Sequence, residues 1–216
     1  MQHATTPLSL AIMGLCAFGA AMNCGCQPNS PKASPGSVTS SPSERSGSGT
    51  DATSNGDRLD DHKKLIKPFV TGIAKSKAVL VYEGLPHKEL ESDLWAKELK
   101  EKKVIKFHDF HFYEGVLTLT EENATQFSSL FSQEKTFERY DGKKVWGPFE
   151  PDWSVAFADG DDVYEVLVCF GCEEARLFGP KNEVFSDLDG AALKKLVAVL
   201  APLRKNRPKS KLEPRK

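Results

Sequence analysis

The residues best suited to chemistry in this chain form the CxxC motif Cys169-Phe170-Gly171-Cys172. A CxxC pair carries out thiol–disulfide exchange when a helix N-terminus lowers the pKa of its first thiol. Here the motif follows the apolar run 163–168, and Gly179-Pro180 arrives too soon to leave room for a full helix. The spacing therefore disfavours a thioredoxin-like enzyme. It favours a short structural disulfide or two buried thiols.

A metal site is the second possibility for the same cysteines. His108 and His111 form an HxxH pair that could join Cys169 and Cys172 in a tetrahedral zinc site. Residues three apart on a regular strand point to opposite faces, so each pair would need a bulge or turn to converge. These four residues are weak candidates as metal ligands. Covalent haem would need a histidine at position 173, where the chain has Glu173, and no cofactor is expected.

The elements that must position these residues follow from hydrophobic periodicity and turn signals. Amphipathic helices are predicted over 89–102, after the N-cap Thr120, and after a cap at Asp187 or Asp189. Asp-Gly and Gly-Pro turns divide the second half into a meander of short strands. The expected fold class is α+β, a mostly antiparallel sheet with about three helices packed on one face. Strands are expected at residues 77–82, 104–111, 115–120, 136–140, 153–158, 162–170, 175–178 and 183–185.

The N-terminus carries the pattern of a targeting segment. Residues 8–22 are almost entirely apolar, which suits a signal-peptide core and falls short of the roughly 20 residues of a membrane span. Cys24 and Cys26 follow directly, and a cysteine there is the acceptor for the lipid of a bacterial lipoprotein. Neither fits the lipoprotein box fully, because Asn23 stands in an unfavourable place for both. Residues 1–26 are predicted to direct export, with lipidation at Cys24 or Cys26; secretion without lipid is the alternative.

The remaining boundaries follow from composition. Residues 27–64 are rich in Ser, Gly and Pro and are predicted to be a disordered tether, because they cannot bury enough apolar surface to offset chain entropy. Residues 65–204 are expected to form one α+β domain. Residues 205–216 are predicted to be a basic, disordered tail. Without interleaved aromatic residues or a groove-reading element, this tail does not indicate a nucleic-acid partner.

Three short motifs resemble one family of bacterial proteins. These are Tyr82-Glu83-Gly84-Leu85-Pro86-His87, Phe149-Glu150-Pro151-Asp152-Trp153 and Cys169-Phe170-Gly171-Cys172-Glu173. Together they are similar to uncharacterised exported proteins common in planctomycete bacteria, over roughly residues 77–207. In that family the middle motif carries a Cys and a His, and the last reads Cys-x-x-Cys-His; Trp146, Glu150 and Glu173 stand at those places here. If the family pattern is a metal or haem site, this chain lacks most of the extra ligands. The resemblance implies export and a single domain, and no particular activity.

The sequence thus predicts an exported cell-envelope protein, membrane-anchored as a lipoprotein, whose domain serves binding or structure. Its alternative localisation is secreted or periplasmic. The alternative function is thiol redox or zinc binding through Cys169 and Cys172. The sequence assigns no enzymatic reaction and no partner other than the membrane that a lipid anchor would enter.

Overall fold

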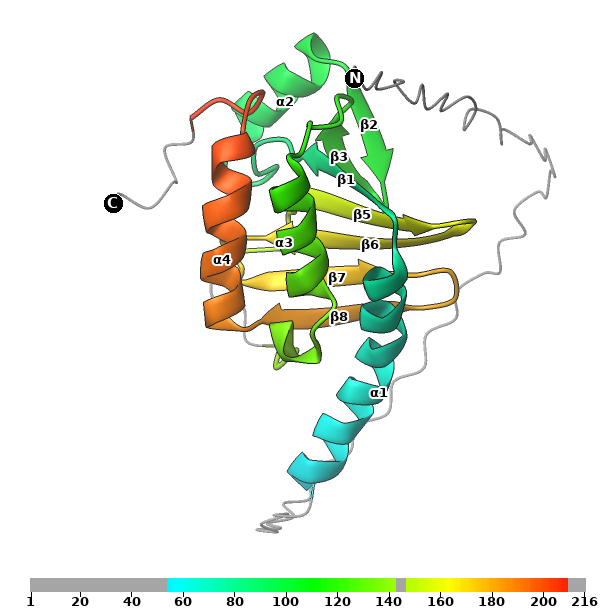
Figure 1. Ribbon diagram of the computed structural model, residues 1–216. Helices are drawn as coiled ribbons and strands as arrows, with labels where there is room; N and C mark the ends of the chain where they lie inside the picture. The colour runs from blue at the N-terminus through cyan, green and yellow to red at the C-terminus, as the bar shows by residue number, and fades with distance from the viewer. Residues whose placement is uncertain (1–53, 143–146, 210–216) are drawn as a thin grey trace, which may run out of the picture. The chain divides into compact units, whose positions relative to one another are not determined.

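The computed structural model describes residues 54–142 and 147–209 (Figure 1). Its helices are α1 (Ser54–Lys75), α2 (Ser92–Glu101), α3 (Glu121–Phe131) and α4 (Gly190–Leu200), with 3-10 turns η1 (Glu134–Thr136) and η2 (Ala201–Leu203). Its strands are β1 (Ala78–Glu83), β2 (Val104–Phe107), β3 (Phe110–Tyr113), β4 (Phe137–Arg139), β5 (Trp153–Asp159), β6 (Asp162–Cys169), β7 (Glu174–Phe178) and β8 (Glu183–Leu188).

Six of these strands form one antiparallel sheet in the order β1-β5-β6-β7-β8-β4. The run β5 to β8 is a meander in which each strand pairs with the next one along the chain. β2 and β3 form a separate two-stranded hairpin. The predicted α+β class with a mostly antiparallel sheet is therefore confirmed.

One face of the large sheet carries the main apolar core. Successive strand residues point to opposite faces, so Trp153 and Phe157 of β5 lie on this side together. Helices α1, α3 and α4 cover the face (Figure 1) and contribute Phe69, Phe127 and Leu196 to it. Three helices pack on one face, as expected, but α1 is one of them and the predicted helix over residues 89–102, which is α2, is not. Helix α2 lies beside the β2–β3 hairpin instead (Figure 1).

The opposite face of the sheet buries a smaller cluster. Leu167 and Cys169 alternate with Val166 and Val168 along β6 and so point away from the helices. Phe112 of β3 and Phe149 cover them. The period of two along one strand thus decides that the CxxC motif lies under the hairpin rather than in the main core.

Two predicted helix caps are confirmed. The hydroxyl of Thr120 accepts a hydrogen bond from the backbone N–H of Asn123, at 3.1 Å. The carboxylate of Asp189 accepts from Ala191 and Ala192, which satisfies two N–H groups that have no partner inside α4.

The prediction of one strand over 104–111 is wrong, because the chain turns back at His108 and Asp109. Both residues have left-handed backbone, with φ of 46° and 74°, and they join β2 to β3. A two-residue turn with two positive φ angles is the connection that suits strand twist, although Gly or Asn usually supplies it. The predicted extension 115–120 forms no strand; only Leu117 bonds to the sheet, through its N–H to the carbonyl of Val81.

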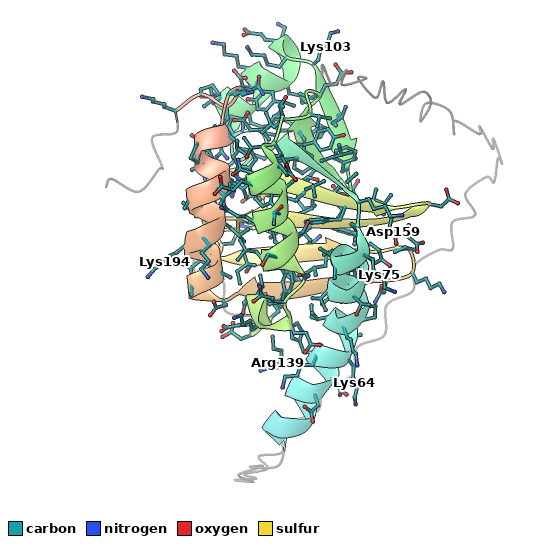
Figure 2. The ribbon with its side chains drawn as sticks, in the orientation of Figure 1. Lys64, Lys75, Lys103, Arg139, Asp159 and Lys194 are labelled. Carbon is teal, nitrogen blue, oxygen red and sulfur yellow. A yellow bond between two sulfur atoms is a disulfide. The ribbon has the colours of Figure 1, made fainter. Side chains whose placement is uncertain are left out.

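Both limits of the predicted domain also need correction. Helix α1 begins at Ser54, so the tether does not extend to residue 64. Its apolar residues Ile66 and Ile73 are buried, whereas Lys64 and Lys75 are exposed (Figure 2). At the other end, residues 205–207 are bound to the domain, so the tail does not begin at residue 205.

The predicted targeting segment 1–26, with Cys24 and Cys26, lies outside the described residues, as do residues 27–53 and 210–216. In the described part of the chain, no helix combines the length and the apolar character needed to cross a bilayer.

Candidate functional site

The CxxC motif forms a covalently closed turn between β6 and β7. Cys169 and Cys172 are joined by a disulfide, and the backbone N–H of Cys172 donates to Sγ of Cys169 at 3.2 Å. The two residues are only 3% and 7% exposed, beneath Phe112 and Phe149. A reagent therefore reaches the sulfur atoms only when the covering residues move.

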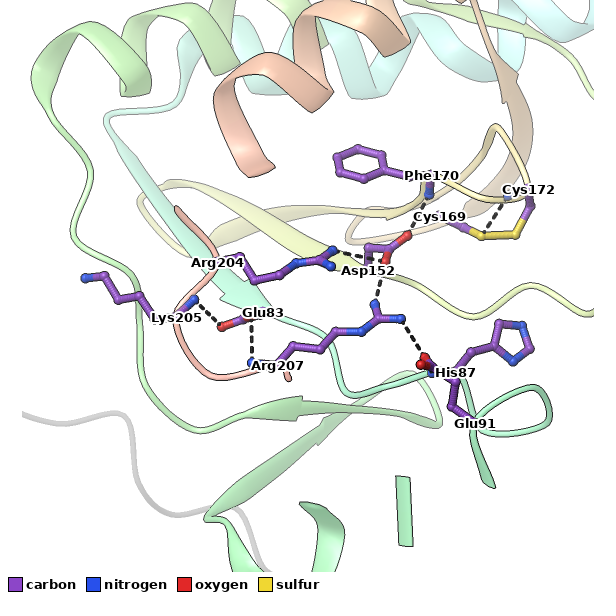
Figure 3. Close-up of polar contacts among 10 residues, drawn as sticks. All are labelled: Glu83, His87, Glu91, Asp152, Cys169, Phe170, Cys172, Arg204, Lys205 and Arg207. Carbon is purple, nitrogen blue, oxygen red and sulfur yellow. Dashed lines mark hydrogen bonds and ion pairs between the residues drawn. A yellow bond between two sulfur atoms is a disulfide. The ribbon is translucent and has the colours of Figure 1, made fainter. Parts of the chain in front are cut away.

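Asp152 connects this turn to the C-terminal segment (Figure 3). Its Oδ2 accepts the backbone N–H of Phe170, inside the motif, at 2.8 Å. Its Oδ1 accepts from Arg207 at 2.5 Å and from Arg204 at 3.4 Å. The other Arg207 nitrogen lies 3.3 Å from the carboxylate of Glu91, and both of these side chains are 9% exposed. The result is a shielded, charge-assisted network, in which each hydrogen bond is stronger than one between neutral groups.

Glu83 holds the same segment from the other side. Its carboxylate is fully buried and accepts the backbone N–H groups of Lys205, Asn206 and Arg207, at 3.1, 2.8 and 2.9 Å (Figure 3). The side-chain amide of Asn206 adds a fourth contact at 3.1 Å. A buried carboxylate is tolerated only when such donors compensate for its lost hydration. Glu83 and the C-terminal segment therefore depend on each other.

His87 lies beside this network with its tautomer set by the backbone. Its Nδ1 accepts the N–H groups of Glu89 and Leu90, at 3.3 and 3.2 Å, which places the ring proton on Nε2. That Nε2 is buried and has no hydrogen-bond partner among the described residues. His87 is therefore a donor held in a fixed orientation, next to Gly147.

Glu150 is the carboxyl group best suited to proton exchange near neutral pH. Burial raises its pKa to about 7, against the opposing influence of the Lys88 and Arg207 cations. A group with a pKa near the working pH is the kind that serves as a general acid or base. No sequence pattern indicates this property, because the raised pKa arises from burial in the folded chain.

The two histidines proposed as zinc ligands lie apart from the cysteines. His108 Nε2 is 2.7 Å from Glu165, whose other oxygen accepts the hydroxyl of Ser154. The His108 ring also stacks on Phe178. Because the Ser154 hydroxyl binds the carboxylate and not the histidine, His108 is not placed to act as a base for Ser154.

His111 packs edge-on against Trp95, with ring centroids 5.6 Å apart. Burial lowers its pKa, and the nearby Lys106 and Lys88 lower it further. Across residues 54–142 and 147–209, no group of three or more His, Cys, Asp or Glu side chains is arranged to hold a metal ion. The structure thus brings Cys169 and Cys172 together and leaves His108 and His111 with other partners.

Sequence reasoning missed the acids and arginines that form the network. Glu83 ends the apolar run of β1 and Asp152 directly precedes Trp153, and the sequence patterns place both only within short motifs. An acid at the end of a buried strand needs a cation or several N–H donors. The cations are visible in the sequence, but Arg207 lies in the segment predicted to be a disordered tail, and Arg204 directly precedes that segment.

Comparisons with models of known protein families, with curated proteins and with solved structures gave no match to this chain.

Proposed function

We propose that this chain is an exported protein of the bacterial cell envelope, anchored to the membrane by a lipid on Cys24 or Cys26, whose α+β domain serves binding or structure. The targeting pattern of residues 1–26 and the resemblance of three motifs to exported planctomycete proteins support export.

The observation that carries the proposal is the buried disulfide between Cys169 and Cys172. Disulfides of this kind persist in oxidising compartments outside the cytoplasm and are rare where thiol reductants are abundant. Its position favours a structural role, because the pair is shielded by aromatic residues and its turn is tied to Asp152. The disulfide would hold the β6–β7 turn in the form that receives the C-terminal segment.

A thiol-redox function is the second candidate, and one contact favours it. The backbone N–H of Cys172 donates to Sγ of Cys169, and the same contact would stabilise a thiolate at Cys169 after reduction. For this function the hairpin covering the pair would have to open to admit a partner thiol.

Intact mass of the full chain, recovered from cell fractions, tests export and anchoring. The expected result is a diacylglyceryl mass on a chain that starts at Cys24 or Cys26, found in the membrane fraction. Replacing the lipidated cysteine by serine should release the protein from that fraction, whereas Cys16→Ser, inside the apolar run, should leave a lipid-bearing mature chain. Cleavage near Ala21 without lipid would replace the anchor by secretion. An uncleaved chain in the cytoplasm would overturn export.

Thiol alkylation of the same material separates the two roles of the cysteines. In the structural role, Cys169 and Cys172 stay unlabelled until the protein is both unfolded and reduced. In the redox role, a dithiol reductant makes them reactive in the folded protein, and Cys169 should label first.

A further inference from the structure

A groove of about 340 Å³ lies between helix α1 and the turn that joins β5 to β6. Its α1 side is one stripe of the helix, formed by Lys64, Lys67, Thr71 and Lys75 at spacings of three and four residues. The opposite side is the β5–β6 turn. Lys75 and Asp159 mark the two sides (Figure 2). The groove is separate from the disulfide and from the Asp152 network.

The floor of the groove is a close contact between Gly72 and the ring of Tyr164. A Cβ at position 72 would collide with this ring, so glycine allows the helix to approach the sheet here. The same approach brings the lysine-bearing stripe of α1 to the edge of the sheet, where it lines the groove together with Tyr164.

The lysines of the groove form no strong ion pair within the described part of the chain. Lys67 and Lys75 have no ion-pair partner among residues 54–142 and 147–209. Lys64 lies 3.3 Å from Asp61, but both side chains are more than 70% exposed, at 75% and 71%. Exposed pairs of this kind contribute little, so Lys64 can turn to another anion. Three lysines that line one groove suit an anion such as phosphate.

The rest of the groove is suited to hydroxyl groups. The hydroxyls of Thr71 and Tyr164 have no hydrogen-bond partner in the described part of the chain. Asp162 has no ion pair there either, and Asp159 has only a 4.0 Å pair with Lys77. Two carboxylates beside an anion site repel a bare anion, but they accept hydrogen bonds from the alcohol groups of a larger ligand.

Pro68 leaves one backbone carbonyl of α1, that of Lys64, free to accept a hydrogen bond from a ligand. Proline has no backbone N–H, so the carbonyl of Lys64, four residues earlier, lacks its usual helical donor. Both residues line the groove.

We propose that this groove binds a phosphate ester whose carbon skeleton carries hydroxyl groups. The phosphate contacts Lys67 and Lys75 with the hydroxyls of Thr71 and Tyr164. The alcohol groups donate to Asp159, Asp162 and the Lys64 carbonyl. The same chemistry is found in free sugar or glycerol phosphates and in the phosphatidylglycerol head group.

A chemical-shift titration of the full ¹⁵N-labelled chain tests the site with three probes: glycerol 3-phosphate, inorganic phosphate and glycerol. Saturable shifts are expected at Lys67, Thr71, Lys75 and Tyr164 with glycerol 3-phosphate, weaker binding with phosphate, and none with glycerol. The double substitution Lys67→Ala, Lys75→Ala should weaken binding roughly tenfold or more, because it removes two charge-assisted hydrogen bonds.

The matched control is Lys194→Ala, Lys195→Ala on α4, which removes the same charge from exposed positions away from the groove (Figure 2). It should bind as the unmodified chain does. Asp162→Asn should strengthen binding of inorganic phosphate and reduce the preference for glycerol 3-phosphate. Absence of localised shifts, or equal losses in the α1 and α4 double variants, would overturn the proposal. All of these positions are exposed, so unchanged thermal unfolding should show that each variant folds.

Vesicles distinguish the two sources of the ligand. If the head group is the natural ligand, the chain with Cys24→Ser and Cys26→Ser should sediment with phosphatidylcholine vesicles only when they contain phosphatidylglycerol. Lys67→Ala, Lys75→Ala should abolish that dependence. If glycerol 3-phosphate binds and vesicles do not, the ligand is a soluble phosphate ester. If neither glycerol 3-phosphate nor the phosphatidylglycerol vesicles bind, the proposed site is contradicted. The proposed export and anchoring are unaffected by that result.

Discussion

Arg207 places its Nη1 2.5 Å from Oδ1 of Asp152, and this contact ties the last described turn of the chain to the turn that carries the disulfide. Asp152 is the shared member, because its other oxygen accepts the N–H of Phe170. The CxxC motif and the C-terminal segment therefore belong to one structural unit, although neither contacts the other directly through these bonds.

Arg207→Ala should destabilise the domain by about 2 kcal/mol. The change removes one cation from two shielded carboxylates, Asp152 and Glu91, while Arg204 still partners Asp152. Urea unfolding followed by circular dichroism measures the loss. Lys209→Ala, at an exposed position, is the control and should stay within about 0.5 kcal/mol. Equal effects of the two substitutions would mean that the network is too solvated to matter.

Ending the chain after Leu203 should destabilise the domain through Glu83. Without residues 205–207 the Glu83 carboxylate, which is buried in the intact domain, loses every donor described for it, and this loss is expected to cost about 3 kcal/mol. In a Glu83→Met background the same truncation should cost less, because the Glu83 carboxylate is no longer left without donors. The loss of Arg204 and Arg207 from Asp152 and Glu91 is common to both backgrounds and cancels in the comparison. A double-mutant cycle on unfolding free energies measures this coupling. Additive effects would show that Glu83 and the segment are independent.

The parts of the fold that sequence patterns predicted were those set by neighbouring residues. The meander from β5 to β8 follows from alternation and from the turns between its strands, and Thr120 and Asp189 are recognisable as caps from local residue types. Helix α1 was missed because its first turns are polar and Pro68 lies inside it. The β2–β3 hairpin was missed because His108 and Asp109 make its turn without glycine.

The candidate site was predictable only where its residues are close together in the sequence. Two cysteines separated by two residues are visible in any sequence, and their short spacing allows a disulfide. Glu83 and Arg207 are 124 residues apart, so nothing in either neighbourhood indicates the other. Which face of the sheet a residue occupies depends on strand register, and the pKa of Glu150 depends on burial. These properties appear only when the strands and the C-terminal segment have been assembled.

Glu150 should make the domain less stable as the pH rises towards neutrality. Burial raises its folded pKa to about 7 from an ordinary 4.5, so between these values the folded state binds more protons than the unfolded state. Stability from this group is complete below about pH 4.5 and is lost as the pH passes 7. Glu150→Gln should remove this slope from urea unfolding measured at several pH values. Glu114→Gln, at an exposed position whose charge is not among those that shift the Glu150 pKa, should keep it. A slope that survives in Glu150→Gln would assign it to another group.

His62 should act in the opposite direction. Burial in α1 beside β4 lowers its pKa below the ordinary 6.5, with Arg139 acting in the same sense, while the Phe137 backbone and Asp187 oppose the shift. The unfolded chain then binds the proton more readily, so stability is complete above about pH 6.5 and declines as the pH falls. The difference between His62→Gln and the unmodified chain, measured from pH 8 to pH 5, isolates this contribution. A difference that does not change with pH would contradict it.

Gly84 should tolerate no side chain, because its backbone lies very close to the backbone of residues 151–152. A Cβ there would collide with the backbone carbonyl of Pro151 and press on Asp152, and backbone atoms cannot move aside as a flexible side chain can. Gly84→Ala is therefore expected to destabilise the domain by about 3 kcal/mol and to weaken the hold of Asp152 on its arginines. Gly115→Ala is the matched control, since nothing lies within 4 Å of its Cβ and it should be neutral or slightly stabilising. Thermal and urea unfolding of the two variants compare them directly. If Gly84→Ala proved as stable as Gly115→Ala, the close packing of β1 against residues 151–152 would be contradicted, and with it the reason for glycine in the Tyr82–His87 motif.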